Sequence, residues 1–493
     1  MIWKIAKKEF LLNLMTFKFA VGTTLCVVLM AAFVPILAKA YQERLKTYGE
    51  NVAYNEAELR KVTVYKNITP TIYRRPSPLA VFSEGLEKQL GNSATIRYDE
   101  VPEISGAAAN HYLSIFSIFD ASLIFKIVIS VLALLVAYDA ISGERERGTL
   151  KLMVSGTAAR HQVLLGKLLA GLTVLVVPVT IAFLMGAAIL LCFPMVHLAG
   201  SDWIRIGFMF IASLVFIATM YNLGLLFSCL ARRSAISLVL ALFLWIIFVL
   251  VIPNGSVYLA AQIMPVESED KINEQIASLR RDTRREFVSE LKRSGRSYMS
   301  GSGSTSDVVG KGGFGHGYIR SCNEVLMHNL MVRYGVGVPI DVRYANKYSE
   351  VQYGYLRSLF EQTRLAASLS RLSPISLYEN VMSALAGTDI ASFRDFIDAV
   401  KVHRNDIVEY IRSRTNNFSS SSFFTPCTKE EMTTRPGGDT APPLGLRDLP
   451  RFTYEPDIVG TLRRVVPDLT FLILGNVLFL AVAFVAFLRY DVR

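Results

Sequence analysis

The sequence predicts an all-α membrane protein with six transmembrane helices, an N-terminal interfacial helix and a large extracytoplasmic α-rich or α+β insertion between spans 5 and 6. Of its 493 residues, 52% are hydrophobic and 19% are charged, a lower charge content than soluble proteins carry. The apolar residues gather in blocks of about twenty, the length that a helix needs to cross a bilayer. These blocks contain almost no ionised side chains, which are costly in hydrocarbon.

The chain begins with an amphipathic stretch over residues 1–16. Apolar and basic side chains fall on opposite faces of a helix there, as in helices that lie on a membrane surface. The apolar face would hold Ile2, Ile5, Phe10, Leu11 and Leu14, and the basic face Lys4, Lys7 and Lys8. A charged lead-in to the first span is the alternative. The first span, residues 17–38, is too long for the apolar core of a cleaved signal peptide, so we expect it to be retained.

The remaining spans follow from five further apolar blocks. They are predicted over residues 117–138, 163–195, 204–230, 234–252 and 468–488. The third span is long enough to tilt, and Pro178 is expected to kink it. The fifth span is predicted to end at Pro253.

Two long polar stretches separate the spans. Residues 39–116 carry balanced charge, and residues 253–467 are far too long for a simple connection, so they must contain a fold of their own. Within the second stretch, apolar residues recur at three- and four-residue spacing. This spacing predicts helices over residues 268–293, 341–369 and 391–413.

Two cysteines, Cys322 and Cys427, lie in the second polar stretch. An oxidising compartment would favour a disulfide between them, and two unrelated thiols are the alternative. The other cysteines, Cys26, Cys192 and Cys229, fall inside apolar blocks, where cysteine behaves as a small hydrophobe. No Cys/His cluster in the sequence points to a metal site.

The distribution of Lys and Arg near the span ends sets the predicted orientation. The N-terminal stretch, the segment after span 2, the link after span 4 and the C-terminus all carry basic residues. In a six-span protein these four segments lie on one side of the membrane. The link between spans 3 and 4, residues 197–202, carries no Lys or Arg. We therefore expect both termini in the cytoplasm and both long polar stretches outside it.

The most distinctive stretch is the charged segment of residues 139–162, which joins spans 2 and 3. Its glycines indicate a turn, and residues of both charge signs surround them. A compact cytoplasmic protrusion of this kind suits a partner protein that must grip it and transmit force, whereas the alternative is a solvated loop with positive-inside charges. Its charged side chains Glu144, Arg145, Glu146 and Arg147 could pair with one another, with the lysines of the N-terminal helix or with that partner.

This segment resembles the link between spans 2 and 3 of type-2 ABC exporter permeases. In that family an acidic residue precedes the pattern S-G-E-[RK]-E-x-G-T-L, which a Ser, an Arg and a G-K pair follow. The matching residues are Asp139, Ser142, Gly143, Glu144, Glu146, Gly148, Thr149, Leu150, Ser155, Arg160, Gly166 and Lys167. The resemblance implies that the segment forms a coupling helix, which docks into a groove of a separate ATPase subunit, and that Asp139, residues 142–150 and Arg160 are the candidate ATPase-coupling residues.

The same resemblance implies the remaining partners. A type-2 permease works with two cytoplasmic ABC ATPase subunits, which bind the ATP and Mg²⁺, and with a second permease in a homodimer or heterodimer. The chain itself would hold no cofactor and would lie in the bacterial cytoplasmic (inner) membrane. Residues 74–91 are also similar to the region after span 1 in permeases of the multi-copper-enzyme and nitrous-oxide-reductase maturation group. No Met, His or Cys cluster there would hold copper.

The implied function is that of the permease subunit of an ABC transporter, which couples ATP hydrolysis by its partner to export or extraction of an unidentified substrate. The size of residues 253–467 supports an alternative. This is an ATP-driven mechanotransmitter or assembly scaffold, which acts on an extracytoplasmic partner protein without moving cargo. A membrane receptor without an ATPase is a third candidate, which the charged segment disfavours.

Three polar residues within the spans are candidates for a translocation pathway. Lys126 lies well inside span 2, and ionisable residues at such depth usually face a cavity or a partner. Snorkelling of its ammonium group toward the interface is the favoured alternative. Tyr221 and Asn222 in span 4 are further candidates, although interhelical hydrogen bonds are the preferred interpretation for both.

Several other function classes lack their motifs. The G-K pair at residues 166–167 is followed by Leu168 rather than by Ser or Thr, so there is no P-loop and the chain is not expected to be an enzyme. Gly310, Gly312 and Gly315 match G-x-G-x-x-G, but no strong strand precedes them, which disfavours a dinucleotide site. The net charge is +11, yet no basic stripe with interleaved aromatics appears, so nucleic acid is not an expected partner.

Overall fold

The structure is a computed structural model that describes residues 2–87, 90–105, 121–150, 159–300, 308–311, 314, 317–321, 323–426, 442–454 and 457–489. Within these residues the chain is mostly helical, and six helical stretches are long and apolar enough to cross a membrane. They are Phe17–Leu59, Ala121–Glu146, Arg160–Leu191, Gly200–Leu230, Ser234–Ile263 and Ile458–Leu488. The prediction of an all-α protein with six apolar spans is confirmed at this level.

The first span is much longer than its apolar block. Helix α1 (Ile2–Leu14) precedes it, and Trp3 on α1 is 78% exposed. Helix α2 (Phe17–Leu59) has 43 residues, which corresponds to about 65 Å, roughly twice the thickness of a bilayer core. The helix therefore continues past the predicted end of the span at residue 38 and carries the chain directly into the first polar stretch.

Two of the six stretches contain a π-helical turn. The second stretch runs through α4 (Ala121–Ile124), the π-helical turn η3 (Phe125–Ile129) and α5 (Ser130–Ala137), before the short helix α6 (Ser142–Glu146). The fifth runs through α10 (Ser234–Ile246), the π-helical turn η4 (Ile247–Val251) and α11 (Ile252–Ile263). The helix thus continues past its predicted end at Pro253, which directly follows the π-helical turn η4, and such local π-helical adjustments are one way in which transmembrane helices accommodate proline.

Helix α9 (Gly200–Leu230) lies at the centre of the bundle. It packs against α5, α10, α8 (Arg160–Leu191) and α17 (Ile458–Leu488). Small residues permit the closest approaches, because Gly171 of α8 lies against the Tyr221 ring of α9, and Gly224 of α9 lies against Ala137 of α5. Helix α9 therefore contacts α5, α8, α10 and α17, and the two glycines allow its close approach to α8 and α5.

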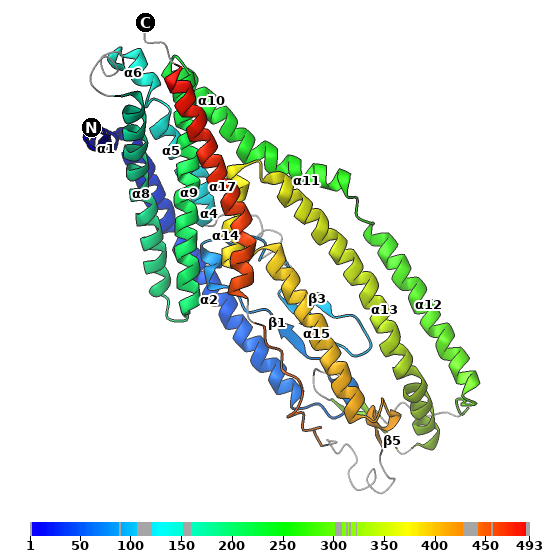
Figure 1. Cartoon of the computed structure of the whole chain (residues 1–493). Helices are drawn as coiled ribbons and strands as arrows, with labels where there is room; N and C mark the ends of the chain where they lie inside the picture. Colours follow the sequence, from blue (N-terminus) through cyan, green and yellow to red (C-terminus); the bar gives the residue numbers. More distant parts are fainter. Residues whose placement is uncertain are drawn as a thin grey trace.

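A second, elongated part of the molecule extends from the bundle, away from the end where both termini and α6 lie (Figure 1). We call it the distal region. Its main helices are α12 (Glu269–Arg293), α13 (Glu324–Ser370) and α15 (Ile390–Arg414). The predicted helices over 268–293 and 391–413 agree with α12 and α15 to within one residue at each end. Helix α13 begins at Glu324 rather than at residue 341, and the side chain of Asn323 caps it.

Small sheets and short helical turns complete the described part of the distal region. Strands β1 (Thr71–Tyr73), β2 (Ser93–Thr95) and β3 (Glu103–Ser105) form an antiparallel sheet in that order, with Ile72 opposite Ala94. Strand β4 (Val308–Lys311) pairs antiparallel with β5 (Gly317–Ser321), which pairs parallel with β6 (Thr425–Pro426). The 3₁₀ turns are η1 (Tyr65–Asn67), η2 (Pro78–Val81) and η7 (Ser420–Ser422). A separate hydrophobic core joins the first sheet to α13 and α15.

One buried helix, α14 (Pro374–Ala386), was not predicted from the sequence. It belongs to the long insertion between spans 5 and 6, yet it packs inside the bundle against α9 and α17 (Figure 1). Ile375, Tyr378 and Leu385 are completely buried. The insertion is therefore not confined to the distal region, since this part of it shares the hydrophobic core of the spans.

A methyl group at position 171 tests the packing around α9. A Cβ atom added to Gly171 would lie 2.2 Å from the Tyr221 ring. We therefore expect Gly171→Ala to force α8 and α9 apart and to cost roughly 1–3 kcal/mol of stability. Gly207→Ala is the matched control, because nothing lies within 4 Å of its added Cβ. The midpoint of thermal unfolding in detergent should fall for the first variant alone, and equal midpoints would contradict the close approach.

Candidate functional site

The charged segment folds as α6 and the turn that follows it, at the end of the bundle where both termini lie (Figure 1). All of the candidate coupling residues named from the sequence, Asp139, Ser142 to Leu150 and Arg160, belong to the described part of the chain. Ser155 of the family pattern falls in residues 151–158, outside the described residues.

A buried lysine connects α6 to two other helices. The Nζ atom of Lys167 on α8 lies 2.7 Å from Oε1 of Glu144 on α6 and 3.0 Å from Oε1 of Glu9 on α1. The side chain of Lys167 is 3% exposed, and those of Glu9 and Glu144 are 18% and 15% exposed. Beside it, Gly166 lets α1 approach α8, because an added Cβ would lie 2.8 Å from Ile5. We call these three charged residues the Lys167 cluster.

Two side chains bind α6 to the C-terminal end of α9. The Oγ atom of Ser228 accepts a hydrogen bond from the backbone N–H of Ser142 at 3.0 Å. Arg145 donates from Nη1 to the carbonyl oxygen of Ala231 at 2.8 Å and from Nη2 to that of Cys229 at 3.2 Å. The last carbonyl groups of a helix lack partners within the helix, so Arg145 caps the end of α9.

The segment also binds the beginnings of α10 and α2. Glu146 accepts hydrogen bonds from the backbone N–H of Ser234 at 3.0 Å and from its hydroxyl at 2.6 Å. A carboxylate at a helix N-terminus also interacts favourably with the helix dipole. On the other side, Nζ of Lys18 lies 2.7 Å from Oδ2 of Asp139 and 2.7 Å from the hydroxyl of Tyr138. The segment therefore contacts α2, α8, α9 and α10, and it is connected to α1 through Lys167.

The turn after α6 is exposed. Arg147, Gly148 and Thr149 are open to solvent, whereas Leu150 is buried. Gly148 has a φ of +75°, in the left-handed region that favours glycine. The Nε atom of Arg147 donates to the carbonyl oxygen of Gly143 at 3.1 Å. A bond to the backbone thus holds this turn in place, and Arg147 and Thr149 lie at its surface.

The remaining predicted site residues lie elsewhere in the bundle. Arg160 donates from Nη1 to the carbonyl oxygen of Leu488 at 2.8 Å and so connects α8 with α17. The hydroxyl of Tyr221 donates to the carbonyl oxygen of Lys167 at 3.0 Å. The Nδ2 atom of Asn222 donates to Oδ1 of Asn476 on α17 at 2.5 Å. Both α9 residues are therefore engaged in interhelical hydrogen bonds.

Lys126 binds a residue from the insertion. Its Nζ atom lies 2.7 Å from Oε2 of Glu379 on α14, and the two side chains are 21% and 50% exposed. Lys126 stands in the π-helical turn η3, and such turns are frequent at functional sites. The ion pair therefore connects span 2 with α14.

The N-terminal end of α14 is fixed to span 5. Ser373 caps α14, because its Oγ atom accepts hydrogen bonds from the N–H groups of Ile375 and Ser376. The same hydroxyl donates to the carbonyl oxygen of Phe248 in η4 at 2.7 Å. Farther along the helix, the Tyr378 ring stacks on a phenylalanine of α9 at a centroid distance of 4.4 Å. The π-helical turns of spans 2 and 5 thus both contact α14.

Residues 74–87 hold the C-terminal end of α14. Four hydrogen bonds join the two segments: Arg74 to the Gly387 carbonyl at 2.6 Å, Ser77 to the Ala386 carbonyl at 2.7 Å, the Leu86 N–H to the Thr388 carbonyl at 3.0 Å and the Thr388 hydroxyl to the Ser83 carbonyl at 3.0 Å. Burial raises the pKa of the neighbouring Glu87 carboxyl, and the positive charges of Arg44 and Arg74 oppose this rise. Residues 74–87, part of the segment that is similar to copper-enzyme maturation permeases, therefore bind the C-terminal end of α14.

Metal-binding and disulfide sites are not supplied by the described residues. Among them, no group of three or more His, Cys, Asp or Glu side chains is arranged to hold a metal ion. Cys322 and Cys427 lie outside the described residues, so their disulfide stays a prediction. Of the described cysteines, Cys26 and Cys229 are buried and Cys192 is exposed, and all three are free.

The sequence did not predict α14 or Glu379, the residue of α14 that forms the ion pair with Lys126. Local signals for this helix exist, because Ser373 and Pro374 form a helix start and Gly387 follows its end with a φ of +70°. Serine at the N-cap, proline at the first helical position and glycine just after the helix are the usual boundary signals. They mark a short helix between residues 369 and 391, although not its burial among the spans.

The Lys167 cluster can be tested by removal of its cation. Lys167→Met keeps the apolar stem but leaves Glu9 and Glu144 without a cation between them, so we expect a loss of about 3–5 kcal/mol of stability. Adding Glu9→Gln and Glu144→Gln should restore much of this loss, because no buried charge then stays unpaired. The measurement is the thermal unfolding midpoint in detergent. A single variant as stable as the parent, or a triple variant no better than the single one, would speak against the cluster.

Comparisons with known proteins agree with this arrangement. Residues 3–492 match the family described as ABC-2 family transporter protein. Over 179 residues, or 35% of the chain, the sequence is 37% identical to the probable ABC transporter permease protein NosY of Stutzerimonas stutzeri. The match spans 62% of the length of that relative. Because the family match extends over nearly the whole chain, this protein belongs to the ABC-2 family of transporter permeases.

Proposed function

We propose that this protein is the permease subunit of an ABC transporter, which couples ATP hydrolysis by a separate ATPase subunit to export or extraction of a substrate across the cytoplasmic membrane. The observation that carries the proposal is the α6 segment. It offers an exposed turn at Arg147 to Thr149, while Glu144, Arg145 and Glu146 bind α8, α9 and α10. A force applied to this turn would reach several spans together.

The proposed orientation puts α6 and both termini in the cytoplasm and the distal region outside it, in a bacterial inner membrane. The positive-inside rule supports this orientation, since basic residues gather at the α6 end of the bundle. Helix α1 is proposed to lie at the membrane surface. Its exposed Trp3 and Leu12 beside Lys4 and Lys8 suit the boundary between headgroups and hydrocarbon.

The proposed assembly contains two permeases and two cytoplasmic ATPase subunits, which would bind all of the ATP and Mg²⁺. Two spans have faces that suit a second permease. In each of the stretches Ser234–Ile263 and Ile458–Leu488, only 17% of the most apolar 18-residue segment is buried inside the protein. These wide apolar faces would contact lipid or the second permease, and a substrate would then lie between the two permeases.

Two observations also favour the second candidate function, a mechanotransmitter that acts on an extracytoplasmic partner without moving cargo. Helix α2 is continuous from its span into the distal region, and α14 joins the insertion to spans 2, 4 and 5 through side-chain contacts. Motion of the spans would therefore be passed to the distal region. The two functions differ in whether a polar or lipid-accessible path opens between the permeases during turnover.

Arg147→Glu tests the proposed docking turn. Arg147 is exposed, and its reversal changes the surface that the ATPase would meet while the Lys167 cluster stays intact. We expect the amount of ATPase that co-purifies from co-expressing cells to fall about tenfold, equivalent to about 1.4 kcal/mol. Lys46→Glu is the matched control, since this exposed residue of α2 lies on the far side of the proposed membrane. Equal co-purification with both variants would exclude the turn as the docking site.

A charge swap tests whether α14 takes part in turnover. Lys126→Glu places two carboxylates together where an ion pair now stands, so we expect the ATPase rate of the assembled complex in nanodiscs to fall roughly 3–10-fold, equivalent to about 1 kcal/mol. The double variant Lys126→Glu with Glu379→Lys should recover most of the rate, because the pair is re-formed in reverse. An unchanged rate in the single variant would remove α14 from the ATPase cycle.

A further inference from the structure

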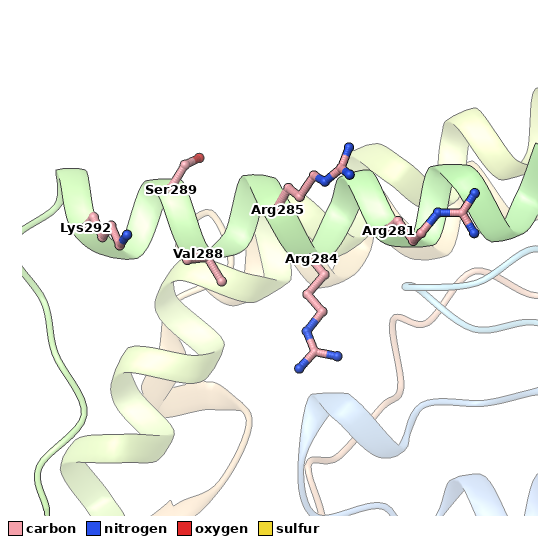
Figure 2. A pocket seen from close by; sticks show the side chains of 6 residues that line it. All are labelled: Arg281, Arg284, Arg285, Val288, Ser289 and Lys292. Carbon is pink, nitrogen blue, oxygen red and sulfur yellow. The ribbon is translucent and has the colours of Figure 1, made fainter.

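The outward face of α12 carries a stripe of basic residues (Figure 2). The residues that line an open groove on this face are Arg281, Arg284, Arg285, Val288, Ser289 and Lys292. Their spacing of three or four residues places them on one side of a helix. We call this set the α12 stripe. Residues 280–296 hold seven basic and three acidic side chains, which leaves a local net charge of +4.

The opposite face of α12 is already occupied. Leu279, Phe287 and Leu291 pack on a small core that includes Ile340 and Tyr344 of α13. A hydrogen bond of 2.6 Å between the hydroxyls of Thr283 and Tyr348 also joins the two helices. The orientation of α12 is thus set by α13, and the stripe faces away from this contact.

The carboxylates of α12 leave the stripe uncompensated. Asp282, Glu286 and Glu290 follow one another at four-residue intervals along a flank of the helix, and Glu286 pairs with Arg343 of α13 at 2.6 Å. Asp282 lies 3.4 Å from Arg285 in an exposed pair, which stabilises little in water. Among the described residues, no carboxylate forms an ion pair with Arg281, Arg284 or Lys292.

We propose that the α12 stripe is the docking surface for an acidic segment of an extracytoplasmic protein, with Val288 as the apolar anchor. The extracytoplasmic location of this surface rests on the proposed function, whereas the acidic character of the docking segment is inferred from the stripe alone. Guanidinium groups bind carboxylates in a bidentate fashion, and arginine is enriched among residues that dominate binding energy. Val288 is 43% exposed between these cations, so an acidic segment that carries an apolar side chain matches the stripe.

A protein matches the stripe better than an anionic bilayer does. A helix that lies on a membrane buries its apolar face in the lipid beside its basic residues, but the apolar face of α12 is packed on α13. The stripe also begins at Arg281, twelve residues after the start of α12 at Glu269, or about 18 Å along the helix. Helix α12 leads away from the bundle (Figure 1), which takes the stripe away from the spans.

The test compares two variants of the full-length protein with the same change in net charge. The stripe variant reverses Arg281, Arg284 and Lys292 to Glu. The control variant reverses Lys46, Lys271 and Arg357, which are exposed and lie outside the stripe. The probe is a fluorescent peptide of Glu residues with interspersed Leu, and the protein is held in nanodiscs of zwitterionic lipid. Fluorescence anisotropy should give a dissociation constant at least about tenfold weaker for the stripe variant, and unchanged for the control.

Two further variants keep the outcome interpretable. Val288→Asn should weaken peptide binding while the charge of the stripe stays unchanged, as expected for an apolar anchor. If the stripe variant does not give a folded protein by its unfolding midpoint, the variant Arg281→Gln, Arg284→Gln and Lys292→Gln replaces it, since glutamine is a good helix former.

Three results would overturn the proposal: no peptide binding by the parent, equal weakening by stripe and control variants, or stripe-dependent binding of phosphatidylglycerol vesicles in place of the peptide. The last result would assign the stripe to a membrane surface. Co-purification of the ATPase is measured for the parent and both variants. Its absence from the parent would count against the permease function alone, whereas failure of the peptide assay with normal ATPase binding would count against the stripe alone.

Discussion

The arrangement at the α6 end of the bundle depends on one buried cation. Lys167 of α8 shares its ammonium group between Glu144 of α6 and Glu9 of α1, and its backbone carbonyl accepts the hydroxyl of Tyr221 from the central helix α9. If α1, α6 and α8 moved apart, buried charges would lose their partners, which is costly. The ion pairs therefore hold these three helices in their relative positions. Glu144 is therefore an internal contact of the bundle, whereas Glu146, which binds Ser234, and the turn that follows it are exposed. A segment that looks like a charged loop in the sequence is in fact part of the packing of the spans.

Helix α14 has the corresponding role at the other end of the spans. It is capped against span 5, paired with span 2, stacked on α9 and clamped by residues 74–87. Both polar stretches of the chain thus meet at a single short helix within the hydrophobic core of the bundle. A change in the separation of the spans would therefore alter the surroundings of α14. Helix α13 of the distal region precedes α14 with only three residues between them.

The sequence predicted the features that depend on local composition. Apolar length identified the spans, and the amphipathic spacing of residues 268–293 and 391–413 identified α12 and α15 to within a residue at each end. The continuation of α2 past residue 38 was missed, because hydropathy falls there although helix propensity does not. Helix α14 was missed although Ile375, Tyr378, Val381 and Leu385 recur at the three- and four-residue spacing of a helix, because only thirteen residues carry the pattern. The roles of Glu144 and Lys126 were beyond prediction for another reason. Their partners Glu9, Lys167 and Glu379 are distant in sequence, and no pattern of spacing brings them together.

Because α2 is one continuous helix, a tilt about one end displaces the other end in proportion to the length of the helix. It is tied near its beginning by the contact of Lys18 with Asp139, beside the α6 segment, and its other end contacts strand β1 of the distal region. A rod of about 65 Å that pivots near one end by about 10° moves its far end by about 11 Å. A modest tilt about this end would therefore move the far end of α2 through a distance greater than the diameter of a helix backbone. Because of the length of α2, a small change in its tilt would give a large displacement of its far end.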